Sequence, residues 1–198
     1  MMENSLNQAY DAFKTEAEAL LETAKVLDRE EMRKAVEALS KAERIGASGC
    51  GHSGIACRHF AHLMCCIERP ARFISPADAV HGALGYMKKG DVMVLVSRGG
   101  KTDELLTILE VCKTKGATVI GVTENLDSPL GTEADIVLAM KVTKECDKYN
   151  CQGTTSFAVT NAIFDALQAA VLEYTGYQKM DFALIHPGGA VGKRLNNK

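Results

Sequence analysis

From residue 43 onward, short apolar segments alternate with longer segments in which apolar residues recur at helical spacing. The predicted strands lie near residues 43–48, 71–74, 91–97, 117–123 and 135–139. The predicted helices between and after them span residues 55–67, 102–115, 128–134 and 154–174. Strands that are joined through helices run parallel. The pattern therefore predicts an α/β fold, a three-layer αβα sandwich around a five-stranded parallel sheet.

Residues 1–42 precede this pattern and predict a pair of helices. In the first, apolar side chains recur at helical spacing from about residue 4 to residue 27. Asp28 then has the character of a helix N-cap, and Glu31 completes a capping-box arrangement for a second helix through about Lys41. We expect this pair to cover one face of the core or to meet the same helices in another subunit.

No Pro/Ser-rich linker and no internal repeat divides the 198 residues. A chain of this length can bury one sizeable core. We therefore expect a single domain over residues 1–198, with N-terminal helices at 1–42, an α/β core at 43–176 and a C-terminal segment at 177–198.

Composition and charge exclude several classes of protein. The chain has 23 Lys and Arg against 25 Asp and Glu, so the basic surplus typical of nucleic-acid binding is missing. No apolar run approaches the roughly 18 residues that span a bilayer, and the N-terminus carries acids where a signal peptide is basic. Seven cysteines without CxxC or Cys/His zinc spacing indicate neither a disulfide framework nor a metal site. We expect a cytoplasmic protein that holds no metal and binds neither nucleic acid nor membrane.

A ligand is expected at the loops that follow the strands, because open parallel sheets bind ligands at the carboxyl ends of their strands. These loops span residues 46–54, 97–102, 123–128 and 141–156. Two are rich in glycine and lead into helices, whose free N–H groups and dipoles attract anions. Together the loops predict a phosphate site, although each one alone is also compatible with plain turns and N-caps. Hydroxyl donors occur at Ser53, Ser97, Thr102, Thr154, Thr155 and Ser156.

The first glycine loop fits neither common nucleotide motif. A Walker loop ends in Gly-Lys-Ser/Thr, whereas this loop offers Gly51-His52-Ser53. The dinucleotide fingerprint has a near match at Gly49, Gly51 and Gly54, but the acid expected about 20 residues later is missing, since the next strand ends in Ile-Ser-Pro. We therefore expect no nicotinamide cofactor.

The runs SGCGHSG, SRGGKTDE, VTKEC, TTS and HPGGAVGKRL together resemble the sugar isomerase (SIS) domain and, more narrowly, the arabinose-5-phosphate isomerase family. The resemblance covers about residues 40–198, and the terminal His-Pro-Gly-Gly run is its most selective piece. That family adds two C-terminal CBS modules, which this sequence lacks. The resemblance implies aldose–ketose isomerisation of a phosphorylated pentose through an enediol, without a cofactor.

The same resemblance implies roles for four residues, because such a reaction needs a base for the proton next to the carbonyl and an acid/base for ring opening. Glu104, Glu145, His186 and His81 match the family's functional Glu, Glu, His and His. We assign Glu145 as the enediol base, since it follows the last strand beside the TTS loop. His186 is expected to open the sugar ring from a neighbouring subunit. Glu104 and His81 are expected to orient the sugar or shuttle protons.

Substrate binding is assigned to Gly51, His52 and the six hydroxyl residues, but two loops depart from the family's pattern. His52 stands where the family has a lysine, and an unperturbed histidine is mostly neutral at pH 7. Arg98 and Lys101 replace a neutral and an acidic residue. Either the phosphate's counter-charge has moved to Lys101 or Arg98, or the substrate has changed or catalysis is lost. We expect an active enzyme, in which His52→Lys raises turnover of arabinose 5-phosphate if the first loop still serves that sugar.

Two other functions remain open at this point. A SIS domain can sense a sugar phosphate and regulate another protein, but a sensor has no need of the proton-transfer groups Glu104, Glu145 and His186. Phosphoheptose isomerase would have the same fold, and no feature of the sequence selects it over the pentose enzyme. A homodimer or homotetramer is expected, because His186 has no obvious partner nearby in the sequence.

A catalytic cysteine is not expected, since an enediol mechanism does not use a nucleophile.

Overall fold

The computed structural model describes residues 1–196 and contains one five-stranded sheet, in which every pair of neighbouring strands is parallel. The strand order is β2-β1-β3-β4-β5. All five predicted strands are present within a few residues of their predicted bounds. They are β1 (Ile45–Gly49), β2 (Ala71–Phe73), β3 (Val92–Val96), β4 (Thr118–Thr123) and β5 (Ile136–Ala139).

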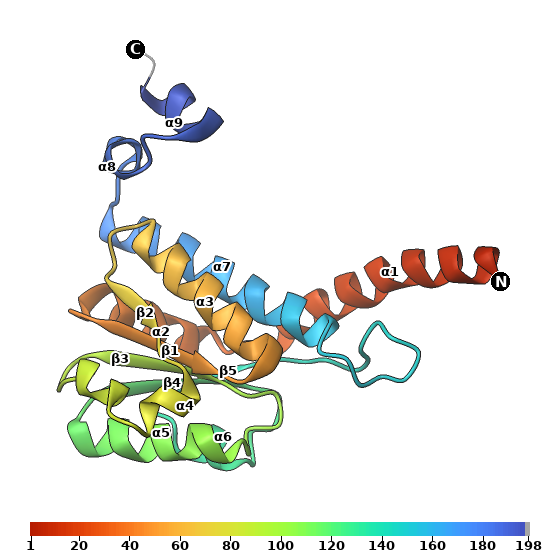
Figure 1. Cartoon of the computed structure of the whole chain (residues 1–198), viewed down its shortest axis with the longest axis horizontal. Helices are drawn as coiled ribbons and strands as arrows, with labels where there is room; N and C mark the ends of the chain where they lie inside the picture. The colour runs from red at the N-terminus through yellow and green to blue at the C-terminus, as the bar shows by residue number, and fades with distance from the viewer. Residues whose placement is uncertain (197–198) are drawn as a thin grey trace.

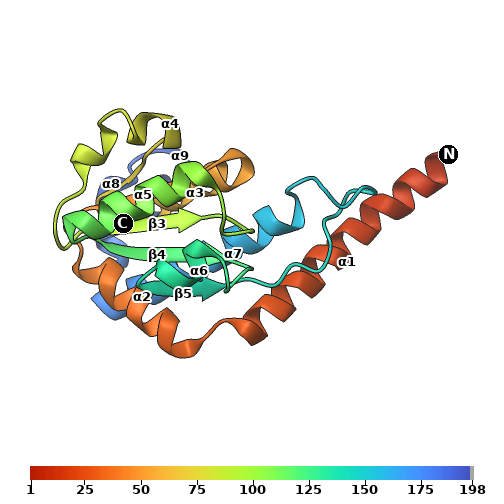
Figure 2. The ribbon, with the colours of Figure 1, turned by 90° about the horizontal axis from the view of Figure 1, so that it is seen from below.

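Helices cover both faces of this sheet, so the predicted αβα sandwich is confirmed (Figures 1 and 2). A separate apolar core lies on each side of the sheet. One face packs against α1 (Met2–Val26), α2 (Arg29–Lys41), α3 (Gly51–Cys65) and α7 (Thr155–Thr175). The other packs against α4 (Pro76–Ala79), the 3-10 helix η1 (Ala83–Tyr86), α5 (Asp103–Lys115) and α6 (Pro129–Glu133).

The central strand explains why the sheet is buried on both faces. All five residues of β3, VMVLV, are buried, and their side chains alternate between the two cores. On the α3 and α7 side, the rings of Phe60 and Phe164 lie 4.5 Å apart between centroids. Burial of such side chains contributes about 1.5–3 kcal/mol each. The sheet and these two helices therefore form a rigid platform for the loops at the strand ends.

The first two helices follow their sequence signals with one exception. The Asp28 carboxylate accepts hydrogen bonds from the backbone N–H groups of Glu30 and Glu31, as an N-cap does. The capping-box prediction is wrong in its second half, because the Glu31 carboxylate does not return to the cap. It accepts a hydrogen bond of 2.8 Å from the N–H of Val137, on the edge strand β5. Glu31 thereby ties α2 to the edge of the sheet.

Two helical segments project away from the sandwich (Figure 1). The first half of α1 extends from one end, and residues 1–11 are all exposed. From the other end extend α8 (Lys179–Ile185) and α9 (Gly189–Asn196), with Leu184 and Ile185 exposed. Large apolar side chains on both arms, Tyr10 and Phe13 among them, thus face solvent in the single chain.

Helix α7 is long and apolar enough, by length and composition alone, to cross a membrane. The expectation that no such segment exists is therefore wrong by this criterion. In the fold, however, α7 packs against α1, α2 and α3, and a central core helix passes the same length and composition test. Its residues buried in the core include Val159, Ile163, Phe164, Leu167 and Val171.

Candidate active site

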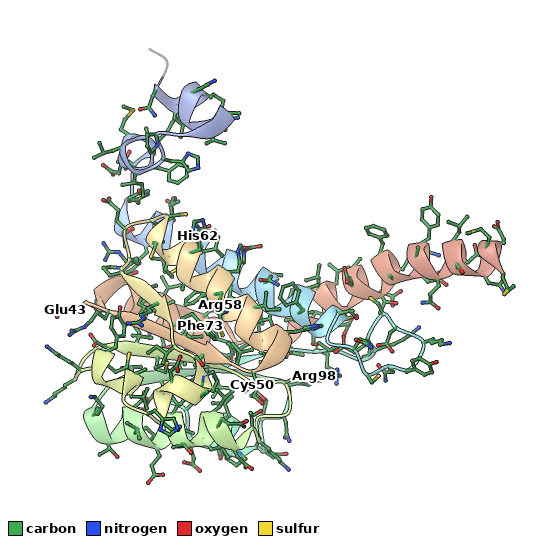
Figure 3. The ribbon with its side chains drawn as sticks, viewed as in Figure 1. Glu43, Cys50, Arg58, His62, Phe73 and Arg98 are labelled. Carbon is green, nitrogen blue, oxygen red and sulfur yellow. The ribbon has the colours of Figure 1, made fainter. Side chains whose placement is uncertain are left out.

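The loops predicted to bind a ligand meet at the carboxyl edge of the sheet. Helices α3, α5 and α7 all begin there, directly after the loops that follow β1, β3 and β5. Figure 3 shows Cys50 and Arg98, from the first two of these loops, at this end of the sheet. The edge holds two open hollows, one on each side of the first glycine loop.

The first, which we name the Cys50 hollow, has a volume of about 390 Å³. Its walls come from the start of α3, the segment after β2 and the first turn of α5. No side chain of residues 1–196 caps the start of α3 here, so its N–H groups face an anion-binding space. The structure thus brings together two predicted site residues, Gly51 and Glu104. The hollow is lined by Gly49, Cys50, Gly51, Gly54, Ile55, Arg58, Phe73, Ser75, Pro76, Ala77 and Glu104.

Arg58 is a residue of this hollow that the sequence analysis missed. Its guanidinium carbon lies 4.0 Å from the centroid of the Phe73 ring, and Figure 3 labels both side chains. Within the described part of the chain, no acid lies within ion-pair distance of Arg58, so its donors remain for a ligand. A signal was present, because Arg58 follows Gly51 by two helical turns and therefore shares its face of α3.

Cys50 lies beside Glu104 in the same hollow. Burial, and then the negative charge of Glu104, raise the pKa of the Cys50 thiol above its ordinary value. The thiol is therefore protonated at neutral pH and is a poor nucleophile.

The second hollow, which we name the His52 hollow, has a volume of about 490 Å³. Nδ1 of His52 lies 2.6 Å from the carbonyl oxygen of Gly153. A carbonyl oxygen can only accept, so Nδ1 carries the hydrogen and Nε2 is left for a ligand. His52 therefore links the first glycine loop to the loop before α7. The hollow is lined by Glu16, His52, Ile55, Gly153, Thr154, Phe157 and Ala158.

Three of the predicted hydroxyl donors lie next to open space. Ser53 and Ser156 line a space of about 20 Å³ with His52 and Arg98, enough for one water. Thr154 lines the His52 hollow. These three residues therefore border open space at this edge, although the Thr154 hydroxyl also donates to Glu145 at 3.3 Å.

The other three predicted donors are engaged within the protein. Ser97 and Thr102 bind each other, with 2.9 Å between their hydroxyl oxygens. Thr155 is fully buried against the Cys146 thiol, away from both hollows. These side chains therefore shape the loops rather than face a ligand.

Arg98 connects three of the loops at this edge. Its Nε donates to Glu124 at 2.8 Å, its Nη1 to Glu145 at 2.7 Å, and its Nη2 to the carbonyl oxygen of Val142 at 2.7 Å. Two carboxylates therefore already neutralise Arg98. Of the two cations considered as the phosphate's counter-charge, Arg98 is committed elsewhere and Lys101 is exposed to solvent.

Glu145, the predicted enediol base, is enclosed by this arrangement. Its side chain is only 3% exposed. One carboxylate oxygen binds Arg98, and the other accepts hydrogen bonds from the Ser156 N–H at 3.1 Å and the Thr154 hydroxyl at 3.3 Å. Glu145 thus holds the first turn of α7, and it lines neither hollow.

Neither of the two predicted histidines lines either of the two hollows. His81 is exposed in the turn after α4 and lines neither of them. His186 follows α8, beyond the far end of α7. Because α7 has 21 residues, about 30 Å separates its two ends. The Nδ1 atom of His186 is buried and has no hydrogen-bond partner among residues 1–196. Within one chain, His186 therefore does not reach Glu104.

No group of three or more His, Cys, Asp and Glu side chains in the described part of the chain is arranged to hold a metal ion. The polar groups of the two hollows include backbone N–H groups, hydroxyls, one guanidinium and one imidazole. Such a set binds the oxygen atoms of an anionic or hydroxylated ligand.

Comparisons with known proteins agree with this architecture. The sequence is 39% identical to the arabinose 5-phosphate isomerase of Pseudomonas aeruginosa over 152 residues, which are 77% of this chain. The chain spans about half, 47%, of that protein's length. It is 38% identical over 148 residues, 75% of this chain, to an Escherichia coli arabinose 5-phosphate isomerase, of which it likewise spans 47%.

Two solved structures have the same fold. A Listeria monocytogenes protein, described as a candidate sugar-phosphate isomerase, superposes with a TM-score of 0.91 at 42% identity, over 95% of this chain and 99% of that one. An Escherichia coli protein in complex with arabinose 5-phosphate superposes with a TM-score of 0.86 at 27% identity, over 93% of this chain and 98% of that one. The sequence matches the SIS domain family over residues 38–170. Because this match covers more than half of the chain, the protein belongs to the SIS domain family.

Proposed function

We propose that this chain is an aldose–ketose isomerase of a phosphorylated sugar, which interconverts D-arabinose 5-phosphate and D-ribulose 5-phosphate. One observation carries the proposal: Glu104 opens onto the Cys50 hollow beside the uncapped start of α3. A carboxylate that can move protons and a backbone that attracts anions thus share one space. The names of the relatives, and the arabinose 5-phosphate bound to a structural neighbour, support this substrate class.

The reaction moves one proton from C2 to C1 and another from O2 to O1, and it leaves the oxidation level of the whole sugar unchanged. After the ring opens, a base takes the C2 proton, the C–H electron pair forms the C1–C2 double bond of the enediol, and the former carbonyl oxygen O1 takes a proton. The O2 proton is then lost as C2 becomes the carbonyl carbon, and a proton returns to C1. Electrons move only within the substrate, so we propose that no redox cofactor takes part. Glu104 and Glu145 are the two carboxylates to be distinguished for this step, and we assign His81 to proton shuttling.

We assign phosphate binding to the start of α3, at Gly51, and other substrate contacts to the hydroxyls of Ser53, Thr154 and Ser156. Arg58 supplies a fixed positive charge for the phosphate, because it lines the Cys50 hollow and has no acidic partner there. His52 presents Nε2 to a sugar hydroxyl from the other side of the loop.

The protein works as a homodimer or homotetramer in this proposal. His186, the acid/base for ring opening, comes from a neighbouring subunit, since the length of α7 keeps it away from the site of its own chain. The exposed apolar residues on the two projecting arms supply surface for such contacts. A cytoplasmic location follows from the substrate class, because phosphorylated sugars are held inside the cell by their charge.

Proton NMR of the purified protein with arabinose 5-phosphate in heavy water tests the proposal. We expect ribulose 5-phosphate to appear while the C2 proton signal of arabinose 5-phosphate is lost, because C2 becomes the carbonyl carbon of the ketose. Ligand-induced shifts without formation of ribulose 5-phosphate would contradict the isomerase assignment for this pentose and favour a sugar-phosphate sensor or another phosphosugar.

A further inference from the structure

We infer that Arg98 is a positioning residue that keeps Glu145 out of proton transfer, and that Glu104 takes the C2 proton. This inference rests on the proposed isomerase function and reverses the roles expected for the two glutamates from the sequence alone. Its basis is the contrast between one carboxylate whose oxygens are both engaged and one that faces an open hollow.

The Arg98 guanidinium acts as a clamp between loops. It is held at three points by Glu124, Glu145 and the carbonyl oxygen of Val142, at 2.7–2.8 Å. Glu124 in turn accepts a hydrogen bond of 2.9 Å from the Val142 N–H with its other oxygen. The loops after β3, β4 and β5 are thus joined through one side chain. Figure 3 labels Arg98 at this edge.

Proton transfer to Glu145 would weaken the interactions that join these loops. Its Oε1 accepts from Arg98, and its Oε2 accepts from the first turn of α7. Protonation of Glu145 would replace its ion pair with Arg98 by a contact between a neutral acid and a partly desolvated guanidinium. This loss is costly because the Glu145 side chain is only 3% exposed. Both oxygens of Glu145 are thus directed at the protein, and the residue lines neither hollow.

Glu104 has the opposite surroundings. It lies in the exposed first turn of α5 and lines the Cys50 hollow. Within residues 1–196 its carboxylate takes part in no side-chain hydrogen bond and no ion pair. A base must be within hydrogen-bond reach of the proton it removes, and Glu104 meets this condition for a ligand in the hollow. The C–H electron pair forms the C1–C2 double bond of the enediol while O1 takes a proton, and Glu104 holds the C2 proton. The same proton or one from solvent is then returned to C1 as O2 loses its proton and C2 becomes the carbonyl carbon.

The matched variants Glu104→Gln and Glu145→Gln test this assignment, since each keeps the shape of the side chain and removes the base. Heavy-water NMR with arabinose 5-phosphate gives kcat and KM for both. We expect Glu104→Gln to lower kcat by about 10²–10⁴-fold with KM little changed. Glu145→Gln should lower kcat by less than about tenfold, because the glutamine oxygen can still accept from Arg98, although its NH2 group cannot accept from the first turn of α7. The reverse order would overturn the inference.

Arg98 is tested with Arg98→Lys and Arg98→Met. Lysine keeps the cation and should retain most of kcat, whereas methionine leaves Glu145 buried and unpaired and should lower both kcat and the melting temperature. In the double variant Arg98→Met/Glu145→Gln, the buried charge is gone, so the melting temperature should partly recover. A double variant as unstable as the single one would contradict the clamp.

Failure of this inference can be told apart from failure of the proposed function. A wild-type protein that forms ribulose 5-phosphate, with equal losses in the two glutamine variants, overturns only the assignment of roles. A wild-type protein that forms no ribulose 5-phosphate overturns the isomerase proposal, and the assignment with it.

Discussion

Gly100 shows how closely the loop after β3 is packed. Its φ of +66° lies in the left-handed region, and a Cβ added there would lie 1.8 Å from the Ser128 hydroxyl oxygen. Gly100→Ala should therefore lower the free energy of unfolding by about 2–4 kcal/mol, through backbone strain and overpacking together. Chemical denaturation measures the loss.

The neighbouring Gly99 is the matched control for this prediction. A Cβ at Gly99 would meet no atom within 4 Å, and its φ is not positive. Gly99→Ala should change the free energy of unfolding by less than about 1 kcal/mol. Equal effects at the two positions would contradict the packing described for Gly100.

The reactivity of the Cys50 thiol depends on the charge of Glu104. Burial and Glu104 raise the pKa of this thiol, so little of the reactive thiolate exists at pH 7 and alkylation is slow. Glu104→Gln removes the charge, lowers the thiol pKa and should speed alkylation of Cys50 by less than about tenfold. Peptide-resolved mass spectrometry after iodoacetamide treatment measures the rate. Glu110→Gln, on the same helix but outside the hollow, should leave the rate unchanged.

At this scale the sequence predicts residue types better than it predicts contacts. The glycines and hydroxyls can be found because turns, helix starts and anion binding use few residue types. The stack of Arg58 on Phe73, and the pairing of Arg98 with Glu145, join residues far apart in the chain. Neither contact has a periodic or compositional signal, so only the folded arrangement reveals them.

At the scale of single elements, Asp28 makes α2 start where it does. Its carboxylate accepts from the N–H groups of Glu30 and Glu31 at 2.8 and 2.9 Å. Asp28→Ala should lower the free energy of unfolding by about 1 kcal/mol. Asp11→Ala, which removes only an exposed pair with Lys14, should change it by less than about 0.5 kcal/mol in the same denaturation experiment.

Elements were predictable in proportion to their length and periodicity. Strand β3 and helices α1, α2, α5 and α7 show a continuous or periodic apolar pattern and lie within a few residues of their predicted bounds. Helix α3 begins four residues before the predicted start, because the segment Gly51–Gly54 has almost no apolar side chains to mark it. The short α4, η1, α8 and α9 were missed, since four to eight residues show too little periodicity.

At the scale of the whole molecule, the proposal that His186 acts from a neighbouring subunit predicts that two inactive variants restore activity when their subunits are mixed. Glu104→Gln and His186→Ala each remove one contribution to the site, so each homo-oligomer should have little activity. Mixed oligomers contain sites in which both residues are intact. Random pairing in a two-fold dimer should restore about a quarter of wild-type activity. No recovery, after native mass spectrometry has confirmed mixing, would contradict a site shared between subunits.

The expectation of a second subunit at the site comes only from the motif around His186. In the single chain, the 21 residues of α7 lie between the loop at its start and α8, which precedes His186. Figure 1 shows α8 and α9 projecting beyond one end of α7. The length of α7 is predictable from the periodicity of its apolar residues. Its direction relative to the sheet, which decides the separation, has no signal in the sequence.

The hydrogen bond between the Val137 N–H and the Glu31 carboxylate also limits how copies of this protein can associate. β5 is one edge of the sheet, and this hydrogen bond uses one of its outward N–H groups. The opposite edge, β2, has only three residues. A short or covered edge is a poor template for an incoming strand. Growth by continuous β-sheet, the route to fibres, is therefore disfavoured at both edges, and association is directed to the helical surfaces.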